Sequence, residues 1–348
     1  MPTALVTGAT GLVGSHIVER LAEDGWRIRA LVRDRSDGAH GGRWDSVRWL
    51  RECGVEIASG DVLDLPSFAE AARNCDVIFH TAAAVTPKAS AIHPYDAFRI
   101  PNVEGTRNAI DAAARSGARL LQLSSVAVYG PEARYKSSKA IAVDESVPFD
   151  PLPQRAYYAR SKRESEQLVM EAHSEGRIWA TAVRPDVIYG RRDRQFVPRV
   201  ARLLRSGIAP VIAGGRAVMA IVNAAHVADG AFRAATSERA GGNAYNLAND
   251  FDVQWREFFR LAGIGLDRRI RLVSIPPWLA RGALTVTKRT IRFLTRGRLN
   301  LVATASLDFM TRDNPFNSDR ARRELGWNPA SRPDVMVPEA FRWWRENR

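Results

Sequence analysis

The sequence predicts an α/β fold: a doubly wound parallel sheet joined by a smaller, discontinuous substrate domain from the C-terminal half. Three observations predict it. A buried-strand pattern at residues 4–6 runs into a glycine-rich turn and then into a helix with Ile17, Val18 and Leu21 facing inward. Further short apolar segments follow it, and several end in small or polar residues. The length of 348 residues exceeds one average domain, so two units or one enlarged α/β unit are expected.

Composition restricts the class of protein. Hydrophobic residues make up 45% of the chain and charged residues 26%, as in ordinary globular proteins. The first strand begins almost at Met1, which predicts a cytoplasmic chain without a signal peptide. Cys53 and Cys75 have neither disulfide-framework nor metal-ligand spacing, so no metal site is expected. The net charge of +13 is spread along the chain without an aromatic-basic module, so no specific nucleic-acid partner is expected.

The turn from Thr7 to Gly14 has the spacing GxxGxxG between a strand and a helix. In that context Gly8 can form the tight turn and Gly11 lets the backbone approach a pyrophosphate. Gly14 allows close packing of the helix on the strand, and the helix N-terminus faces the phosphate charge. This segment therefore predicts a dinucleotide site.

The second strand, at residues 27–32, ends at the position that selects between NAD and NADP. An acidic residue there would hold a ribose 2′-hydroxyl, whereas this chain has Arg33. The arginine fork suits the 2′-phosphate of NADP. Asp34 follows directly, so NADP is favoured and NAD remains the alternative.

The next two strands also end in residues suited to a cofactor. The third, at residues 55–58, leads to Asp61, which could accept a hydrogen bond from an adenine amino group. Capping of a helix is the alternative for such an aspartate, and Asp64 before Pro66 suits that role better. The fourth strand, at residues 76–80, ends in small residues at 81–84 that let the backbone pass close to the cofactor.

The fifth strand, at residues 120–123, delivers Ser124 and Ser125 to the same edge of the sheet. A helix expected over residues 157–171 carries Tyr158 and Lys162, which are four residues apart and therefore lie on one face. A phenol has a pKa of about 10, so a tyrosine that works as an acid or base near neutrality needs a nearby positive charge. Lys162 can supply that charge.

Seven segments together resemble the extended short-chain dehydrogenase/reductase family, which contains sugar-nucleotide epimerases and dehydratases, 3β-hydroxysteroid and sterol dehydrogenases, and dihydroflavonol-type reductases. They are Thr7 to Gly14, Gly60-Asp61, His80 to Ala83, Asn102 to Thr106, Ser124 to Gly130, Tyr158 to Lys162 and Arg184 to Gly190. The expected order continues through His226 to Asp229 and Arg322 to Trp327, so the resemblance covers nearly the whole chain.

The resemblance implies a Rossmann fold and a role for each matched position. Tyr158 would be the catalytic acid or base, Lys162 its partner and ribose contact, and Ser125 the donor to the substrate oxygen. Asn102 would position the active-site helix or a water, although Pro101 before it departs from the family pattern. Further cofactor contacts carried over in this way are Gly8, Thr10, Gly11, Leu12, Val13, Gly14, Arg33, Asp61, Val62, Ala82, Ala83, Tyr158, Lys162 and Pro185.

The chain is expected to leave the cofactor domain after residue 188. Residues 1–188 and 218–250 are assigned to the dinucleotide-binding domain, and residues 189–217 and 251–348 to the substrate domain. A helix is expected over Arg191 to Arg205, followed by a turn at Gly214-Gly215. Residues 220–235 are expected to return to the cofactor domain as strand and helix. For His226, an interdomain hydrogen bond is favoured over contact with substrate.

Residues 276–309 form a basic, amphipathic segment. Basic residues occupy one helical sector and apolar residues such as Leu279 and Phe293 the opposite one. No uncharged run is long enough to span a bilayer. The apolar side is expected to roof the substrate pocket, and the alternative is peripheral contact with an anionic membrane through residues 277–298. A homodimer is a further expectation.

These patterns predict an NAD(P)-dependent oxidoreductase that transfers hydride at a secondary alcohol or ketone. The apolar residues of 276–309 favour a sterol-like, terpenoid or other lipophilic small-molecule substrate. A sugar-nucleotide epimerase or dehydratase of the same family is the first alternative, with Arg191, Arg192 and Arg216 as partners for a pyrophosphate. A non-catalytic, cofactor-binding sensor or scaffold is the alternative from another class.

Overall fold

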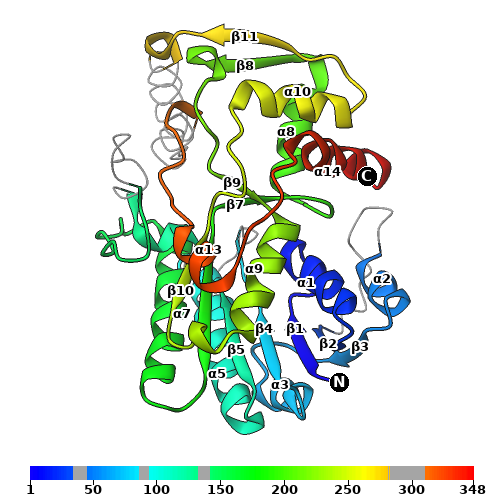
Figure 1. Ribbon diagram of the computed structural model, residues 1–348, viewed down its shortest axis with the longest axis vertical. Helices are drawn as coiled ribbons and strands as arrows, with labels where there is room; N and C mark the ends of the chain where they lie inside the picture. The colour runs from blue at the N-terminus through cyan, green and yellow to red at the C-terminus, as the bar shows by residue number, and fades with distance from the viewer. Residues whose placement is uncertain (34–44, 86–93, 132–141, 281, 283–309) are drawn as a thin grey trace.

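A computed structural model of the chain describes residues 1–33, 45–85, 94–131, 142–280, 282 and 310–348. Its centre is a seven-stranded parallel sheet in the order β10-β6-β5-β4-β1-β2-β3, with helices on both faces (Figure 1). The predicted doubly wound fold is therefore confirmed. The strands are β1 Thr3–Thr7, β2 Arg27–Val32, β3 Glu56–Ser59, β4 Val77–His80, β5 Arg119–Leu123, β6 Ala180–Pro185 and β10 Ala244–Leu247.

The central strands consist of almost continuous apolar residues because helices cover both of their faces. Successive side chains of β1 point to opposite faces: Val6 packs with α1 (Leu12–Glu23) and α9 (Ala224–Thr236), whereas Leu5 packs on the other side. That other face is covered by α3 (Leu65–Ala72), α5 (Gly105–Ser116) and α7 (Tyr157–Ser174). Gly117, in the left-handed conformation, ends α5.

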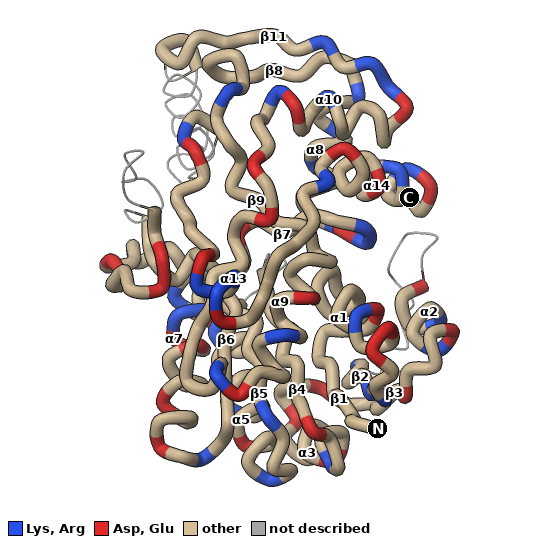
Figure 2. The backbone as a smooth tube through the Cα atoms, in the orientation of Figure 1, with Lys and Arg blue, Asp and Glu red and all other residues tan. Residues whose placement is uncertain are grey.

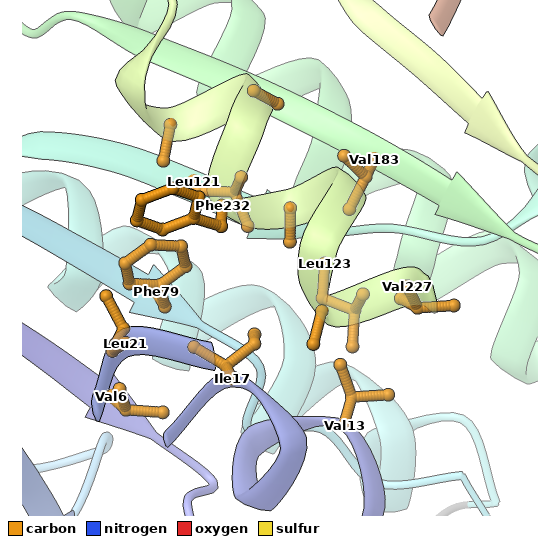
Figure 3. Close-up of a cluster of buried hydrophobic side chains, with 14 of the residues drawn as sticks. Val6, Val13, Ile17, Leu21, Phe79, Leu121, Leu123, Val183, Val227 and Phe232 are labelled. Carbon is orange, nitrogen blue, oxygen red and sulfur yellow. The ribbon is translucent and has the colours of Figure 1, made fainter. Parts of the chain in front are cut away.

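The core under α1 fixes the helix that follows the glycine turn. Val13, Ile17 and Leu21 point from α1 toward the sheet and toward Val227 and Phe232 of α9 (Figure 3). These side chains are at most 8% exposed. Burial of such residues contributes about 1.5–3 kcal/mol each, so the position of α1 over β1 is strongly determined.

A second unit has its own apolar core. It contains β8 (Ile208–Ile212) paired with β11 (Arg271–Ile275), and the helices α8 (Phe196–Leu203), α10 (Trp255–Gly265) and α14 (Pro333–Glu346). A two-stranded parallel pair, β7 (Val187–Tyr189) with β9 (Ile221–Asn223), lies between this unit and the large sheet (Figure 1). In the described ranges the structure also has the helices α2 Ser46–Glu52, α4 Asp96–Arg99 and α13 Asp319–Leu325, with short turns η1 Ile100–Glu104, η2 Val126–Tyr129, η3 Leu204–Ser206, η4 Ala213–Gly215 and η5 Glu238–Ala240.

The helix expected over Arg191 to Arg205 is shorter than predicted, because α8 begins at Phe196. Asp193 ends the preceding turn by accepting hydrogen bonds from the backbone N–H groups of Gln195, Phe196 and Val197. The strand expected at 220–223 is present as β9, but it pairs with β7 and does not enter the seven-stranded sheet.

The C-terminal segment also packs onto the large sheet unit. Trp327 is fully buried in the core under α1, and its indole N–H donates to the carbonyl of His226 over 2.9 Å. It falls within the range 251–348 that was assigned to the substrate domain, so this part of the segment contacts the cofactor domain. The domain ranges themselves stay a prediction.

Most of the predicted amphipathic segment, residues 281 and 283–309, lies outside the described residues. The pocket roof and the membrane contact expected for this segment therefore stay predictions. Among the residues that are described, none of the helices is long and apolar enough to cross a bilayer.

Candidate active site

The glycine turn is built from contacts that only glycine permits at two positions. Gly8, with φ +72°, begins the turn, and Gly11 N–H donates to its carbonyl over 2.8 Å. A Cβ atom on Gly14 would lie 2.3 Å from the Gly8 oxygen. The first turn of α1 therefore packs directly against the end of β1.

The N-terminus of α1 is suited to an anion. Gly11 is its N-cap, no side chain caps the helix, and its first turn contains no acidic residue. The first N–H groups of a helix have no partner within the helix, and the helix dipole attracts negative charge there. Leu12 and Val13 supply N–H groups of this first turn, and Thr10 lies in the turn before it. These residues fit a pyrophosphate.

The ends of β2 and β3 bring the next predicted contacts to the same edge. Arg33 follows β2 directly and is exposed. Asp61 follows β3, and its carboxylate accepts a hydrogen bond from the backbone N–H of Leu63 over 2.9 Å. This bond stabilises the loop that follows β3. Asp64 is the N-cap of α3, as predicted. The carbonyl of Val62 accepts from the side-chain amide of Asn108 over 2.8 Å.

The loop after β4 lies against the glycine turn. Thr81 donates its hydroxyl to the carbonyl of Thr7 over 2.7 Å, and Ala82 N–H donates to the Thr7 hydroxyl over 3.3 Å. A Cβ atom on Gly8 would lie 2.9 Å from the Ala82 nitrogen. Ala82 is half-buried and Ala83 exposed, so small residues occupy this edge beside the turn.

Asn102 joins this loop to the helix that carries Tyr158. Its carboxamide accepts from Ala84 N–H over 2.7 Å and donates to Ala84 O over 3.1 Å and to the Ser161 hydroxyl over 2.9 Å. It lies in the π-helical turn η1, and Pro101 is accommodated at the start of that turn. The side chain is 2% exposed and fully engaged, so it acts by positioning α5, α7 and the loop.

Ser125 and Tyr158 are brought together by η2 and α7. Ser125 is the N-cap of η2, where its hydroxyl accepts from Ala127 N–H over 3.2 Å. Its side chain also lies close enough to the Tyr158 phenol to influence the pKa of that phenol. Burial raises the pKa of the Tyr158 phenol, and the nearby Ser125 side chain opposes this effect without overcoming it. The chain by itself therefore keeps Tyr158 protonated.

Lys162 lies one turn further along α7 and is 3% exposed. Its ammonium donates to the carbonyl of Leu123 at the end of β5. Burial lowers the pKa of Lys162 to about 8, and the negative charge of Glu166 opposes this change. Pro185, the last predicted cofactor contact, is buried at the end of β6 beside this region.

A buried ion pair that sequence reasoning missed supports both α7 and η2. The guanidinium of Arg184 on β6 donates to Glu166 on α7 over 2.6 and 3.0 Å, and to the Tyr129 hydroxyl over 2.7 Å. Tyr129 ends η2 and donates to Asn246 of β10 over 2.9 Å. One sequence signal was available: Glu166 follows Lys162 by four residues, so it lies on the same face of α7.

His80 at the end of β4 is buried beside these groups. Its Nδ1 lies 2.9 Å from the Thr7 hydroxyl, whereas its Nε2 has no hydrogen-bond partner. Burial and the nearby charge of Lys162 lower the pKa of His80 to about 3, so its ring is neutral at physiological pH. His80 adds no charge to the site.

The arginines proposed as pyrophosphate partners for an epimerase are engaged elsewhere. Arg192 is 3% exposed and binds Glu19 of α1 over 2.6 and 2.8 Å and the Ser15 hydroxyl over 2.9 Å. Arg191 binds Glu19 over 3.0 Å and Glu339 of α14 over 3.4 Å. These pairs connect α1 with the second unit, so both arginines that the epimerase alternative considered already have carboxylate partners in this structure. Arg216 is exposed.

His226 forms a hydrogen bond with Asp250, with 2.8 Å between Nδ1 and Oδ2. The predicted bond is present, but its partner falls within the range assigned to the cofactor domain. Across the described part of the chain, no three His, Cys, Asp or Glu side chains are grouped as metal ligands.

Comparison with known proteins covers most of the chain. Residues 4–248 match the model of the NAD dependent epimerase/dehydratase family. The chain is 30% identical to a ceramide reductase of Caulobacter vibrioides, over 97% of this chain and 89% of the relative. It is 29% identical to a 4-hydroxy-2-methyl-3-oxo-4-farnesyl-3,4-dihydroquinoline-1-oxide ketoreductase of Stigmatella aurantiaca, over 92% of this chain and 90% of the relative. The crystal structure of gox2253 has a TM-score of 0.74 and 28% identity, covering 99% and 98% of the two chains.

Proposed function

Because the chain belongs to the NAD-dependent epimerase/dehydratase family, we propose that it transfers hydride between a nicotinamide cofactor and a secondary alcohol or ketone of a lipophilic substrate. The relatives reported above are reductases, and the chain is an enzyme of this oxidoreductase class. The observation that carries the proposal is the placement of Ser125, the N-cap of η2, near the Tyr158 phenol, with Lys162 buried one turn further along α7. Asn102 and the loop at 81–84 hold these groups beside the glycine turn.

Each residue of this group has a chemical task in the proposal. The Ser125 hydroxyl holds the oxygen of the substrate, and the Tyr158 phenol gives that oxygen a proton in reduction or takes one in oxidation. The Lys162 ammonium stabilises the phenolate that Tyr158 becomes after giving up its proton. The nicotinamide, when bound, supplies or accepts the hydride. Burial opposes ionisation of Tyr158, so positive charge near the phenol is needed for it to act as an acid near neutrality.

We propose NADP as the favoured cofactor because Arg33 stands exposed at the end of β2, where a 2′-phosphate would lie. An arginine at this position can form charge-assisted hydrogen bonds with phosphate oxygens. NAD remains the alternative, since no described residue other than Arg33 argues for the phosphate.

A lipophilic substrate is supported by two observations. The names of both relatives specify lipophilic molecules, a ceramide and a farnesyl-bearing dihydroquinoline. In this chain, Trp278 and Leu279 at the start of the predicted amphipathic segment are 72% and 48% exposed. The same exposed pair supports peripheral membrane contact through residues 277–298, which stays part of the proposal.

The proposal is tested by following NADPH and NADH absorbance while the purified protein is offered a hydroxysteroid, a long-chain ketone and a UDP-sugar. We expect oxidation of NADPH with the long-chain ketone, or its formation from NADP with the hydroxysteroid. Conversion of the UDP-sugar alone would replace the proposal by the epimerase interpretation, and it is followed by chromatography because epimerisation and dehydration leave the cofactor unchanged overall. Cofactor binding without turnover of any compound in a wider carbonyl panel would favour the sensor.

Replacement of Tyr158 tests the catalytic group directly. Tyr158→Phe should lower kcat by at least about 100-fold, because a positioned acid or base typically contributes this factor. Cofactor affinity should change little, since the ring remains. The matched control is Tyr157→Phe, the same change one residue earlier on α7, where we expect kcat to stay within about twofold. A Tyr158→Phe enzyme as active as the control would remove Tyr158 from the mechanism.

A further inference from the structure

Five arginines line a surface hollow in the second unit, away from the residues of the candidate active site. The hollow has a volume of about 250 Å³ and lies where α8, α10 and α14 end. Figure 2 shows basic residues along this side of the upper unit, around α10 and the C-terminal end of α14. We call it the arginine hollow, and its basic residues are Arg202, Arg205, Arg268, Arg345 and Arg348.

Carboxylates neutralise only part of this charge. Arg345 lies 3.5 Å from Glu346 and 4.0 Å from Asp267. The other four arginines have no carboxylate within ion-pair distance anywhere in the described ranges. Arg202 donates to the carbonyl of Pro198 over 3.1 Å, and the Arg268 side chain donates to the carbonyl of Arg205.

Helix ends account for only part of the arrangement. The C-terminus of a helix carries about half a negative charge, so three converging ends attract cations. Together with Asp267 and Glu346 they offset only part of the positive charge of the five guanidinium groups. A hollow lined by positive charge raises the local concentration of anions, and a bound anion reduces the repulsion between the guanidinium groups.

We propose that the arginine hollow binds a phosphate-bearing anion. Arginine forks form paired, charge-assisted hydrogen bonds with phosphate oxygens, and several of them suit a group with more than one negative charge. The volume is slightly below the range of about 300–1,000 Å³ typical of drug-sized ligands, so the hollow suits a diphosphate or a phosphate headgroup. Trp344 and Leu266, which also line it, provide apolar contact for the rest of such a molecule.

The bound phosphate group could belong to a free phosphate compound or to a lipid headgroup. One arm of the test therefore measures binding of inorganic pyrophosphate by calorimetry. The other measures co-sedimentation with vesicles of phosphatidylcholine containing phosphatidic acid, against phosphatidylcholine alone. The variant is Arg202→Gln, Arg205→Gln and Arg268→Gln combined. The matched control removes three arginine charges from the other unit, by Arg27→Gln, Arg51→Gln and Arg115→Gln.

All of these proteins keep the glycine turn, which could also accept pyrophosphate, so the comparison is made between variants. We expect the affinity of the hollow variant for one of the two probes to fall at least about tenfold, while the control variant keeps its affinity. The probe that loses affinity shows whether the ligand is a free phosphate compound or a lipid headgroup. Binding should weaken as NaCl is raised, because the arginines are at the surface. Equal behaviour of the hollow variant and the control in both arms would overturn the proposal, as would absence of binding by the unmodified chain.

Discussion

Burial of Lys162 opposes the protonated state that its proposed catalytic role requires. The side chain must be protonated to stabilise a phenolate on Tyr158, yet its surroundings lower its pKa to about 8. The carbonyl of Leu123 and the charge of Glu166 limit this effect, and the buried Arg184 holds Glu166 in place. Lys162 therefore stays mostly protonated near neutral pH, although its pKa is lowered.

This leads to a prediction about stability. The pKa of Lys162 is lower in the folded chain than its ordinary value of 10.5. The buried charge therefore lowers the free energy of unfolding by its full amount below about pH 8, and this loss disappears as pH rises toward 10.5. Relative to Lys162→Met, the unmodified chain should therefore gain roughly 2–4 kcal/mol of unfolding free energy between pH 7 and pH 10.5. Urea unfolding of both proteins measures it. Arg160→Met on the same helix is the control, and a constant difference for both variants would refute the prediction.

Arg33 carries the choice of cofactor. Arg33→Asp should weaken NADP binding by at least about tenfold and NAD binding much less, because an attractive pair with the 2′-phosphate becomes repulsive. Fluorescence titration with both cofactors provides the measurement. Arg27→Asp, at the opposite end of β2, is the control with the same charge change. Equal loss of both cofactors would show that Arg33 does not contact the phosphate.

Among the elements, the glycine turn and α1 depend on the closest backbone packing. Gly14→Ala would place a methyl group 2.3 Å from the Gly8 oxygen and 2.9 Å from the Ala9 Cα, and neither backbone atom can move freely. We expect loss of cofactor binding and a destabilisation of about 1–3 kcal/mol, the usual range for overpacking. Thermal unfolding and cofactor titration test this.

Gly105→Ala in α5 provides the comparison. Its conformation is helical and its nearest neighbour is the flexible side chain of Val62 at 3.2 Å, so its stability should change by less than about 1 kcal/mol. If Gly14→Ala were as well tolerated as Gly105→Ala, close packing of α1 on β1 would not be needed for the site.

The whole molecule should be sensitive to acid. Burial lowers the pKa of His16 and of His80 to about 3, so both rings stay neutral in the folded chain while the unfolded chain takes up protons below about pH 6.5. Stability is therefore lost as pH falls from 6.5 toward 3. Between pH 7 and pH 5 each histidine should account for about 2 kcal/mol of that loss.

Urea unfolding at pH 7 and pH 5 measures this loss. His16→Gln and His80→Gln should each reduce the pH-dependent loss by about 2 kcal/mol, with each variant's own stability at pH 7 as its reference, and the two effects should add. An unchanged loss in both variants would mean that these histidines are protonated in the folded chain.

Local sequence patterns predicted much of the fold and many residues of the candidate site. Spacing within a few residues predicts the strand, glycine turn and helix at the N-terminus. It also predicts Asp64 as a helix cap, Ser125 at a strand end, and the pair Tyr158 and Lys162 on one helix. Such spacing is set by the periods of strand and helix, which the chain encodes locally. The sequence by itself therefore predicted the doubly wound sheet and which elements carry the candidate site.

Only the tertiary structure decided which partners these residues have. Glu166 meets Arg184 across 18 residues, Asn102 meets Ser161 across 59, and Glu19 meets Arg192 across 173. The periods of helices and strands do not specify such pairs, because they depend on how whole elements pack. For that reason the sequence could not show that Arg192, considered only as a pyrophosphate partner in the epimerase alternative, pairs with Glu19. The pairing of Glu166 with Arg184 likewise depends on how α7 packs against the sheet.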